Sequence, residues 1–126
     1  MLEIKNLTGG YVNIPVLKDV SFEVGDGQLI GLIGLNGAGK STTINEIIGL
    51  LRPYAGEIRI DGLTLATSPS AYRQKIGYIP ETPSLYEELT LREHIETVAM
   101  AYDLDQEAVF ARVTPLLKQF RLEEKL

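Results

Sequence analysis

The chain has 126 residues, of which 44% are hydrophobic and 23% are charged, which predicts one globular domain or a piece of one and argues against a multidomain or a disordered chain. Its 12 basic and 17 acidic residues give a net charge of −5, which argues against a general nucleic-acid binder. The absence of cysteine and the single histidine exclude disulfide frameworks, thiolate zinc sites and histidine-rich metal sites.

Two strands are predicted near the start of the chain. Apolar and polar residues alternate over residues 2–7 and again over residues 20–24, which is typical of strands buried on one face. Turn residues follow each segment, at residues 8–10 and residues 25–27. We therefore expect an antiparallel pair.

A different kind of strand is predicted over residues 29–33, which have no polar or charged side chain. Such a run is typical of a strand that is buried on both faces in the centre of a sheet. Apolar residues at helical spacing then predict an amphipathic helix over residues 41–51, and we expect Pro53 to stop it.

A β-hairpin is predicted around Asp61 and Gly62, because a two-residue Asp-Gly connection is the strongest short-range hairpin signal. Ser68 is expected to cap a short helix with Pro69 in its first turn. Residues 76–79 are expected to return as a strand, and residues 80–84 are expected to form a linker.

Helices are predicted after the linker. Thr90 and Glu93 have the spacing of a capping box in front of an apolar helical face. A second apolar stripe predicts a helix over residues 109–120, which Pro115 interrupts because its ring clashes with the carbonyl four residues earlier. Two alternatives remain open: a kink at Pro115, or a restart of the helix with Thr114 as its cap.

A phosphate-binding motif precedes the first helix. Residues 34–41 read Gly-Leu-Asn-Gly-Ala-Gly-Lys-Ser and match the pattern G-x-x-x-x-G-K-S/T. Glycines let backbone N–H groups wrap a phosphate chain, and the positive end of the helix dipole points at the anion. In this pattern Lys40 reaches the β- and γ-phosphates and the Ser41 hydroxyl ligates Mg²⁺. The predicted phosphate-binding residues are Gly34, Asn36, Gly37, Ala38, Gly39, Lys40, Ser41 and Thr42.

The chain resembles the nucleotide-binding domain of ABC-type ATPases over nearly its whole length. The resemblance rests on the early strands, the phosphate loop, the hairpin over residues 57–65, residues 76–81 and the helix opening at residues 89–95. It implies an α/β fold of the P-loop NTPase class, with a RecA-like core, an N-terminal antiparallel β subdomain and the start of a helical subdomain. The implied boundaries are residues 1–89 for the core and residues 90–126 for the partial helical subdomain.

The resemblance also implies roles for residues outside the loop. Tyr11 is similar to the aromatic residue that stacks on adenine, with Val16 beside it, although edge packing of the tyrosine is an alternative. Glu81 stands where the family usually has a glutamine that senses Mg²⁺ and the γ-phosphate. Because carboxylates are good Mg²⁺ ligands, Ser41 and Glu81 are the expected metal ligands, and a solvated loop acid is the alternative for Glu81. His94 is interpreted as a surface or partly packed residue.

Three sequences of the family do not occur in residues 1–126: the L-S-G-G-Q signature, the Walker B strand ending in Asp-Glu, and the switch histidine. The resemblance implies that they lie after Leu126, so we expect an incomplete domain, an N-terminal fragment with no catalytic residue of its own. Such a fragment is expected to bind ATP with Mg²⁺ without turnover, because it lacks the carboxylate that orients water. It is also expected to oligomerise or to be only marginally stable, because it leaves a sheet edge and an apolar helix face uncovered.

The resemblance implies an ATP-binding subunit of an ABC transporter that forms a head-to-tail dimer with a second nucleotide-binding domain and works with a transmembrane permease. No nucleic-acid partner and no direct membrane insertion are expected. A cytoplasmic location is expected, since no apolar run approaches about 18 residues and no signal-peptide pattern follows Met1. A nucleotide-binding interaction module and a non-transport ATPase of the same superfamily remain alternatives.

Overall fold

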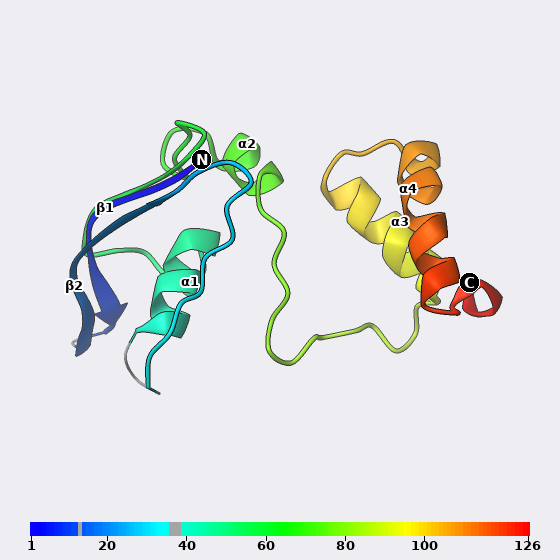
Figure 1. Cartoon of the computed structure of the whole chain (residues 1–126), viewed down its shortest axis with the longest axis horizontal. Coiled ribbons are helices and arrows are strands. Elements are labelled where there is room, and N and C mark those ends of the chain that lie inside the picture. Colours follow the sequence, from blue (N-terminus) through cyan, green and yellow to red (C-terminus); the bar gives the residue numbers. More distant parts are fainter. Residues whose placement is uncertain (13, 36–38) are drawn as a thin grey trace. The chain divides into compact units, whose positions relative to one another are not determined.

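The computed structural model describes residues 1–12, 14–35 and 39–126 (Figure 1). Its helices and strands are β1 (Leu2–Tyr11), β2 (Ile14–Val24), α1 (Lys40–Ile48), β3 (Ala55–Ile60), α2 (Pro69–Gln74), α3 (Leu91–Ala101), α4 (Gln106–Gln119) and the 3₁₀ helix η1 (Glu123–Lys125). The chain divides into two compact units, Met1–Tyr78 and Ile79–Leu126. The boundary between residues 89 and 90 stays a prediction.

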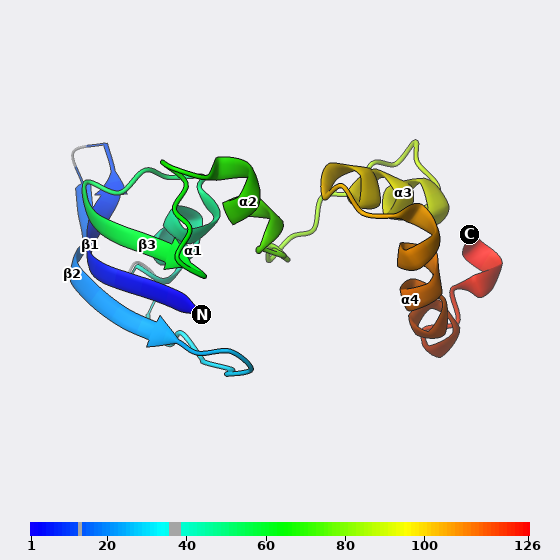
Figure 2. The ribbon, with the colours of Figure 1, turned by 90° about the horizontal axis from the view of Figure 1, so that it is seen from above.

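The first unit is built on a sheet of order β2-β1-β3, in which both neighbouring pairs are antiparallel (Figure 2). The predicted antiparallel pair is therefore confirmed, but the turn predicted at residues 8–10 is wrong. Gly9 pairs with Leu17 and Gly10 pairs with Pro15, so β1 continues through both glycines. A Cβ at Gly10 would lie 2.2 Å from the carbonyl oxygen of Ile14, which shows that glycine serves close strand approach here rather than a turn.

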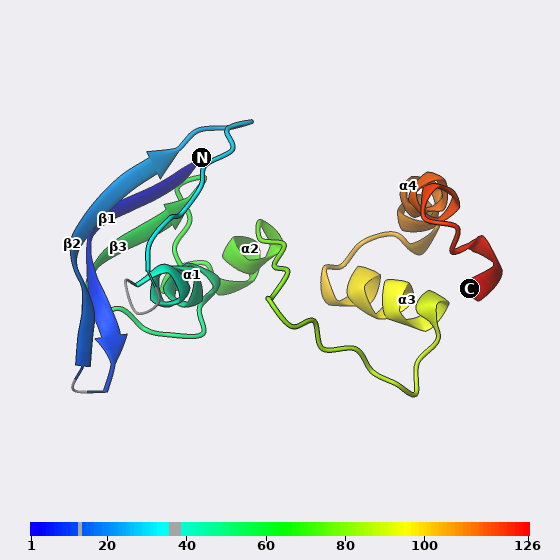
Figure 3. The same ribbon diagram turned by 60° about the horizontal axis from the view of Figure 1, so that its bottom comes forward.

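One face of this sheet carries the core of the first unit and is covered by α1 (Figure 3). Ile4, Leu7 and Leu17 are its fully buried members. The partly buried residues packed around them are Leu2, Val20, Phe22, Ile47 and Ile58. Ile47 is the member that comes from α1, so the helix completes the core that the strands begin.

The helix predicted over residues 41–51 is confirmed as α1, with a different end. Gly49 adopts φ of 89° and its N–H bonds the carbonyl of Asn45, so the helix stops at a left-handed glycine before it reaches Pro53. The predicted apolar face is partly wrong, because Ile44 is 38% exposed while Thr42, Thr43 and Glu46 are buried.

The predicted Asp-Gly turn is confirmed. Asp61 and Gly62 have φ values of 50° and 78°, and Ile60 and Leu63 exchange two backbone hydrogen bonds of 3.0 and 2.9 Å across them. Two left-handed residues give the turn whose twist matches antiparallel strands. The second arm of the hairpin pairs only at Leu63 and is not a strand. Pro69 opens α2 after Ser68, as expected, but the Ser68 side chain makes no capping hydrogen bond.

Two predicted strands, over residues 29–33 and residues 76–79, are wrong, because both segments are irregular. Leu29 is 99% exposed and Ile79 is 88% exposed. A strand buried on both faces needs a hydrogen-bonded neighbour on each side and layers above and below it. Within residues 1–12, 14–35 and 39–126, the only sheet is β2-β1-β3, and it pairs with neither segment.

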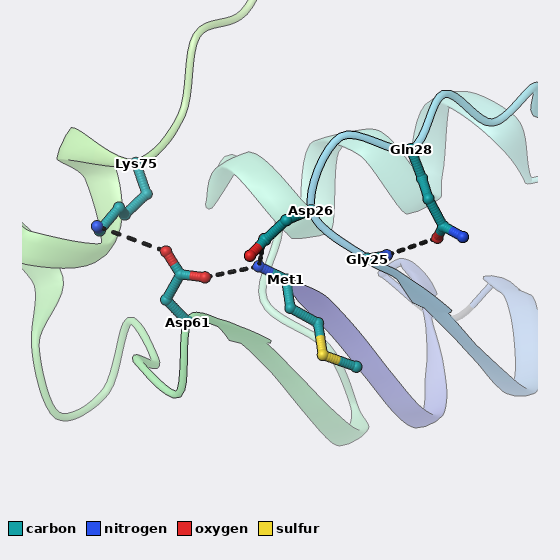
Figure 4. A network of polar contacts seen from close by, with 6 residues as sticks. All are labelled: Met1, Gly25, Asp26, Gln28, Asp61 and Lys75. Carbon is teal, nitrogen blue, oxygen red and sulfur yellow. Dashed lines mark hydrogen bonds and ion pairs between the residues drawn. The ribbon is translucent and has the colours of Figure 1, made fainter.

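Polar contacts join the two turns at one end of the sheet to the start of β1 (Figure 4). The amine of Met1 donates to Asp26 at 2.7 Å and to Asp61 at 2.6 Å, and Lys75 lies 3.4 Å from the other oxygen of Asp61. The amine of Met1, followed by Lys75, lowers the pKa of the Asp61 carboxyl. The network therefore fixes the Asp61 turn next to the turn that contains Asp26.

The second unit contains α3 and α4, which contact each other. The predicted capping box is confirmed: the N–H of Glu93 donates to Thr90 Oγ1 at 3.2 Å, and the N–H of Thr90 donates to Glu93 Oε2 at 2.7 Å. The helix α4 runs without a break through Pro115, and the Thr114 hydroxyl donates to the Phe110 carbonyl at 2.6 Å. The alternative of a restart capped by Thr114 is therefore wrong.

His94 is partly buried, and both of its ring nitrogens are engaged within the second unit. Nδ1 lies 2.8 Å from the Thr90 carbonyl oxygen, and Nε2 accepts from the N–H of Tyr86 at 3.1 Å. The histidine therefore holds the segment before α3, which confirms its interpretation as a packing residue.

No helix in the described part of the chain is long and apolar enough to cross a membrane.

Substitution of Gly56 tests the close contact between the backbones of β3 and β1. Gly56 has φ of 94°, and a Cβ there would lie 2.3 Å from the carbonyl oxygen of Asn6 in β1. We expect Gly56→Ala to lower the free energy of unfolding by more than the roughly 1–2 kcal/mol of left-handed strain alone, because β3 must also move off β1. Urea unfolding of the variant measures this loss.

Two other glycines serve as controls. Gly62 has φ of 78° with nothing within 4 Å of a Cβ, so Gly62→Ala should show the strain alone. Gly77 has open space and no positive φ, so Gly77→Ala should unfold as the wild type does. If Gly56→Ala and Gly62→Ala lowered the free energy of unfolding equally, this would contradict the contact between β3 and the backbone of β1.

Candidate functional site

The predicted phosphate loop ends at Gly39, which fixes the start of α1. Gly39 adopts φ of 98° and ψ of 8°, and its carbonyl accepts from the N–H of Thr43 at 2.9 Å and from the Thr43 hydroxyl at 2.7 Å. The backbone N–H groups at the start of a helix have no partner inside the helix. The first turn of α1 therefore offers N–H groups at the end of the loop, which is the arrangement that binds anions.

The strand β2 supports this end of the loop. A Cβ at Gly39 would lie 2.5 Å from Leu17 Cδ2 and 3.4 Å from Val16 Cγ1, so the glycine backbone rests on both side chains. Leu17 is only 5% exposed and belongs to the core. The structure therefore brings the predicted residue Val16 together with the loop.

Lys40 and Ser41 present their polar groups differently. The Lys40 amine donates to the carbonyl oxygen of Gly34, so the side chain reaches from one end of the loop to the other. Ser41 is exposed, while Thr42 is only 4% exposed. Of the two neighbouring hydroxyls, the Ser41 hydroxyl is therefore the one that is accessible to a metal ion.

Tyr11 is the last residue of β1 and pairs with Ile14. The residue is 47% exposed, and its backbone carbonyl accepts a hydrogen bond from the Tyr54 hydroxyl. The tyrosine is therefore held by a strand end and not by the Gly-Gly turn that the sequence suggested. Among the described residues, no hydrogen bond or ring contact joins Tyr11 to the loop.

Four of the predicted site residues are not among those that the structure brings together. Asn36, Gly37 and Ala38 lie outside the described residues. Glu81 is exposed and belongs to the second unit, so its role as a metal ligand stays a prediction.

Sequence reasoning missed Glu46. This residue of α1 is 1% exposed, and neither of its carboxylate oxygens has a hydrogen-bond partner. Burial raises the pKa of the carboxyl. The apolar spacing of the helix gave no sign of an inward acid, and the only related signal is Gly9, which leaves room for it on β1.

The comparisons with known proteins agree with this geometry. A family described as "ABC transporter" matches residues 17–126. The chain is 58% identical to the ABC-type transporter ATP-binding protein EcsA of Bacillus subtilis, over all of this chain and 51% of that protein. It is 38% identical to the SkfA peptide export ATP-binding protein SkfE of the same organism, over 99% of this chain and 52% of that protein.

A solved structure described as an ATP binding subunit of an ABC transporter is 56% identical, with a TM-score of 0.94. The alignment covers 100% of this chain and 52% of that one. A putative ABC transporter ATP-binding protein from Pyrococcus furiosus is 29% identical, with a TM-score of 0.68 over 81% of this chain and 48% of that one. The chain thus spans about half the length of the relatives it matches.

These matches confirm the predicted fold class, a P-loop NTPase of which the structure shows the antiparallel β subdomain, the loop helix and the first helices of the second unit. The loop that ends at Gly39, followed by Lys40 and Ser41 at the start of α1, matches the pattern from which phosphate binding is predicted. The chain therefore belongs to the ABC transporter family, among its ATP-binding subunits.

Proposed function

We propose that the chain binds Mg-ATP through residues 34–42 and that the complete protein uses ATP to power transport across a membrane. The observation that carries this proposal is the end of the loop, where a left-handed Gly39 leads directly into α1 and Lys40 reaches back to Gly34. Family membership supports the same activity.

The donors at the loop fit a triphosphate. The N–H groups of Lys40, Ser41 and Thr42 open α1, and the Lys40 ammonium adds a mobile positive charge that can donate to phosphate oxygens. The Ser41 hydroxyl is proposed to hold Mg²⁺, and Glu81 is proposed as a further oxygen ligand on its chemistry alone. When bound, ATP supplies a phosphoanhydride whose cleavage releases free energy, and Mg²⁺ neutralises its oxygens.

Tyr11 and Val16 are proposed to bind the adenine ring. Val16 contacts the end of the loop at Gly39, and Tyr11 stands exposed at the end of the paired strand. An aromatic face stacks on a base of any identity, so this contact supplies affinity more than choice of base.

The complete protein is proposed to dimerise head to tail with a second nucleotide-binding domain and to couple to a transmembrane permease at the cytoplasmic side of a membrane. Residues 1–126 contain no Walker B Asp-Glu sequence. These residues alone are therefore proposed to bind nucleotide without turnover, which makes them a binding module within the larger enzyme.

The first test of this function removes the Lys40 amine. Loss of one charge-assisted contact should cost on the order of 1.5–3 kcal/mol, so Lys40→Ala should bind Mg-ATP about tenfold or more weakly than the wild type. Isothermal titration calorimetry measures the two dissociation constants. Lys18→Ala removes an exposed lysine of β2 and should bind as the wild type does. Equal affinities for Lys40→Ala and the wild type would refute the proposed site.

The second test separates the ring of Tyr11 from its hydroxyl. If the ring stacks on adenine, Tyr11→Ala should weaken binding by roughly 1–3 kcal/mol for both ATP and GTP, and Tyr11→Phe should change little. Fluorescence competition against a labelled nucleotide measures the affinities of the wild type and both variants for ATP and for GTP. A Phe variant as weak as the Ala variant would show that the hydroxyl, and not the ring face, makes the contact.

A further inference from the structure

An acid is buried in the contact between α1 and the sheet. Glu46 is 1% exposed, whereas the other buried residues of this helix, Thr42 and Thr43, are 4% exposed and small. The apolar Ile44 is 38% exposed. Glu46 is therefore the largest fully buried side chain of the helix that carries Lys40 and Ser41.

The carboxyl of Glu46 lies directly on the backbone of Gly9 in β1. A Cβ at Gly9 would lie 1.7 Å from Glu46 Oε1 and 2.7 Å from Cδ, so the acid fills the space that the glycine leaves. Gly9 pairs across the sheet with Leu17, and Leu17 supports Gly39. The paired strands β1 and β2 thus contact the helix region at two places: Leu17 of β2 contacts Gly39 at the end of the loop, and Gly9 of β1 contacts Glu46.

The surroundings of Glu46 favour its neutral form. A buried ionised carboxylate without a partner is costly, and neither Glu46 oxygen has one. Gly9 of β1 lies against the carboxyl, and β2 contacts the helix start through Leu17 and Val16, so the strand residues known to contact this part of α1 are uncharged. Burial raises the pKa of the carboxyl above its ordinary value of 4.5.

A cavity lies beside Glu46 within the first unit. The residue lines this cavity of about 850 Å³ between α1, β3 and α2. The charged and titratable groups that share this cavity with Glu46 are Arg52, Glu57, Tyr72 and Arg73. None of these four bonds to the Glu46 carboxyl in the structure, yet two of them are cations toward which an anion would move.

We propose that Glu46 is a positioning residue for nucleotide binding that acts only when protonated. The neutral acid fills the space at Gly9 and holds α1 on the sheet. The ionised side chain moves into the cavity and loosens the helix that carries Lys40 and Ser41. This inference rests on the proposed binding of Mg-ATP. The inference goes beyond the proposed function because it makes nucleotide affinity depend on a residue that does not contact the nucleotide.

The direction of the pH effect follows from linkage. Because the carboxyl is harder to ionise when it is packed against Gly9, ionisation favours the loosened helix. The packed form is therefore fully favoured below about pH 4.5, and this advantage is lost as the pH rises toward the pKa of the packed form. Nucleotide affinity should fall in the same direction.

The test compares wild type with Glu46→Gln in the complete protein, because glutamine has the same shape and cannot ionise. The dissociation constant for Mg-ATP is measured at intervals from pH 5.0 to 8.5, together with the melting temperature. We expect the ratio of the wild-type constant to that of Glu46→Gln to rise with pH, by no more than about tenfold per pH unit, and then to level off. Taking the ratio removes the titration of ATP itself.

Two further variants sharpen the comparison. Glu23→Gln makes the same change at an exposed acid of β2, and it should follow the wild type at every pH. Gly9→Ala places a methyl group where Oε1 lies, so it should displace the carboxyl and bind weakly at every pH.

The outcomes separate this inference from the proposed function. Wild type that fails to bind Mg-ATP at any pH would refute the proposed function itself. Wild type that binds, with a ratio that stays constant across the pH range, would overturn the role of Glu46. A Glu46→Gln variant that melts below the wild type at pH 8.5 would overturn it as well, because the neutral side chain should then be the more stable one.

Discussion

The packing of α1 on the β1–β2 pair is the contact on which the rest of the first unit depends. It completes the apolar core through Ile47, and it sets where the proposed phosphate loop ends, because Gly39 rests on Leu17. Only a residue without a side chain fits at that place and adopts its positive φ. The position of the first N–H groups of the helix therefore depends on Leu17 and Val16 of β2, whose side chains carry no polar group.

This arrangement links affinity to stability. A loop that binds phosphate through backbone N–H groups works only if those groups are held in place, since the ligand must otherwise supply the free energy to order them. Here the ordering comes from Thr43, which bonds the Gly39 carbonyl twice, and from the strands beneath. Glu46 is buried in the same contact, and burying a carboxyl without a hydrogen-bond partner costs free energy that an apolar side chain would not cost.

Local signals in the sequence predicted local structure well. The Asp61-Gly62 turn and the Thr90 capping box each depend on a few neighbouring residues, and the structure contains both features. Residues 29–33 and residues 76–79 failed as strands because a strand exists only with a partner, which no local pattern supplies. Gly9 was misread for a related reason, since its role is set by Glu46, which lies far away in the sequence.

The most direct test of the account maps where Mg-ATP binds. Titration of isotope-labelled protein, followed by backbone amide resonances, should show the largest shifts at residues 34–42, with further shifts at Tyr11 and Val16. The amides of Gly9 and Leu17 should shift less but measurably, because they support the loop helix without touching the nucleotide. Shifts concentrated elsewhere, with residues 34–42 unmoved at saturating Mg-ATP, would contradict the assignment of this loop as the nucleotide site.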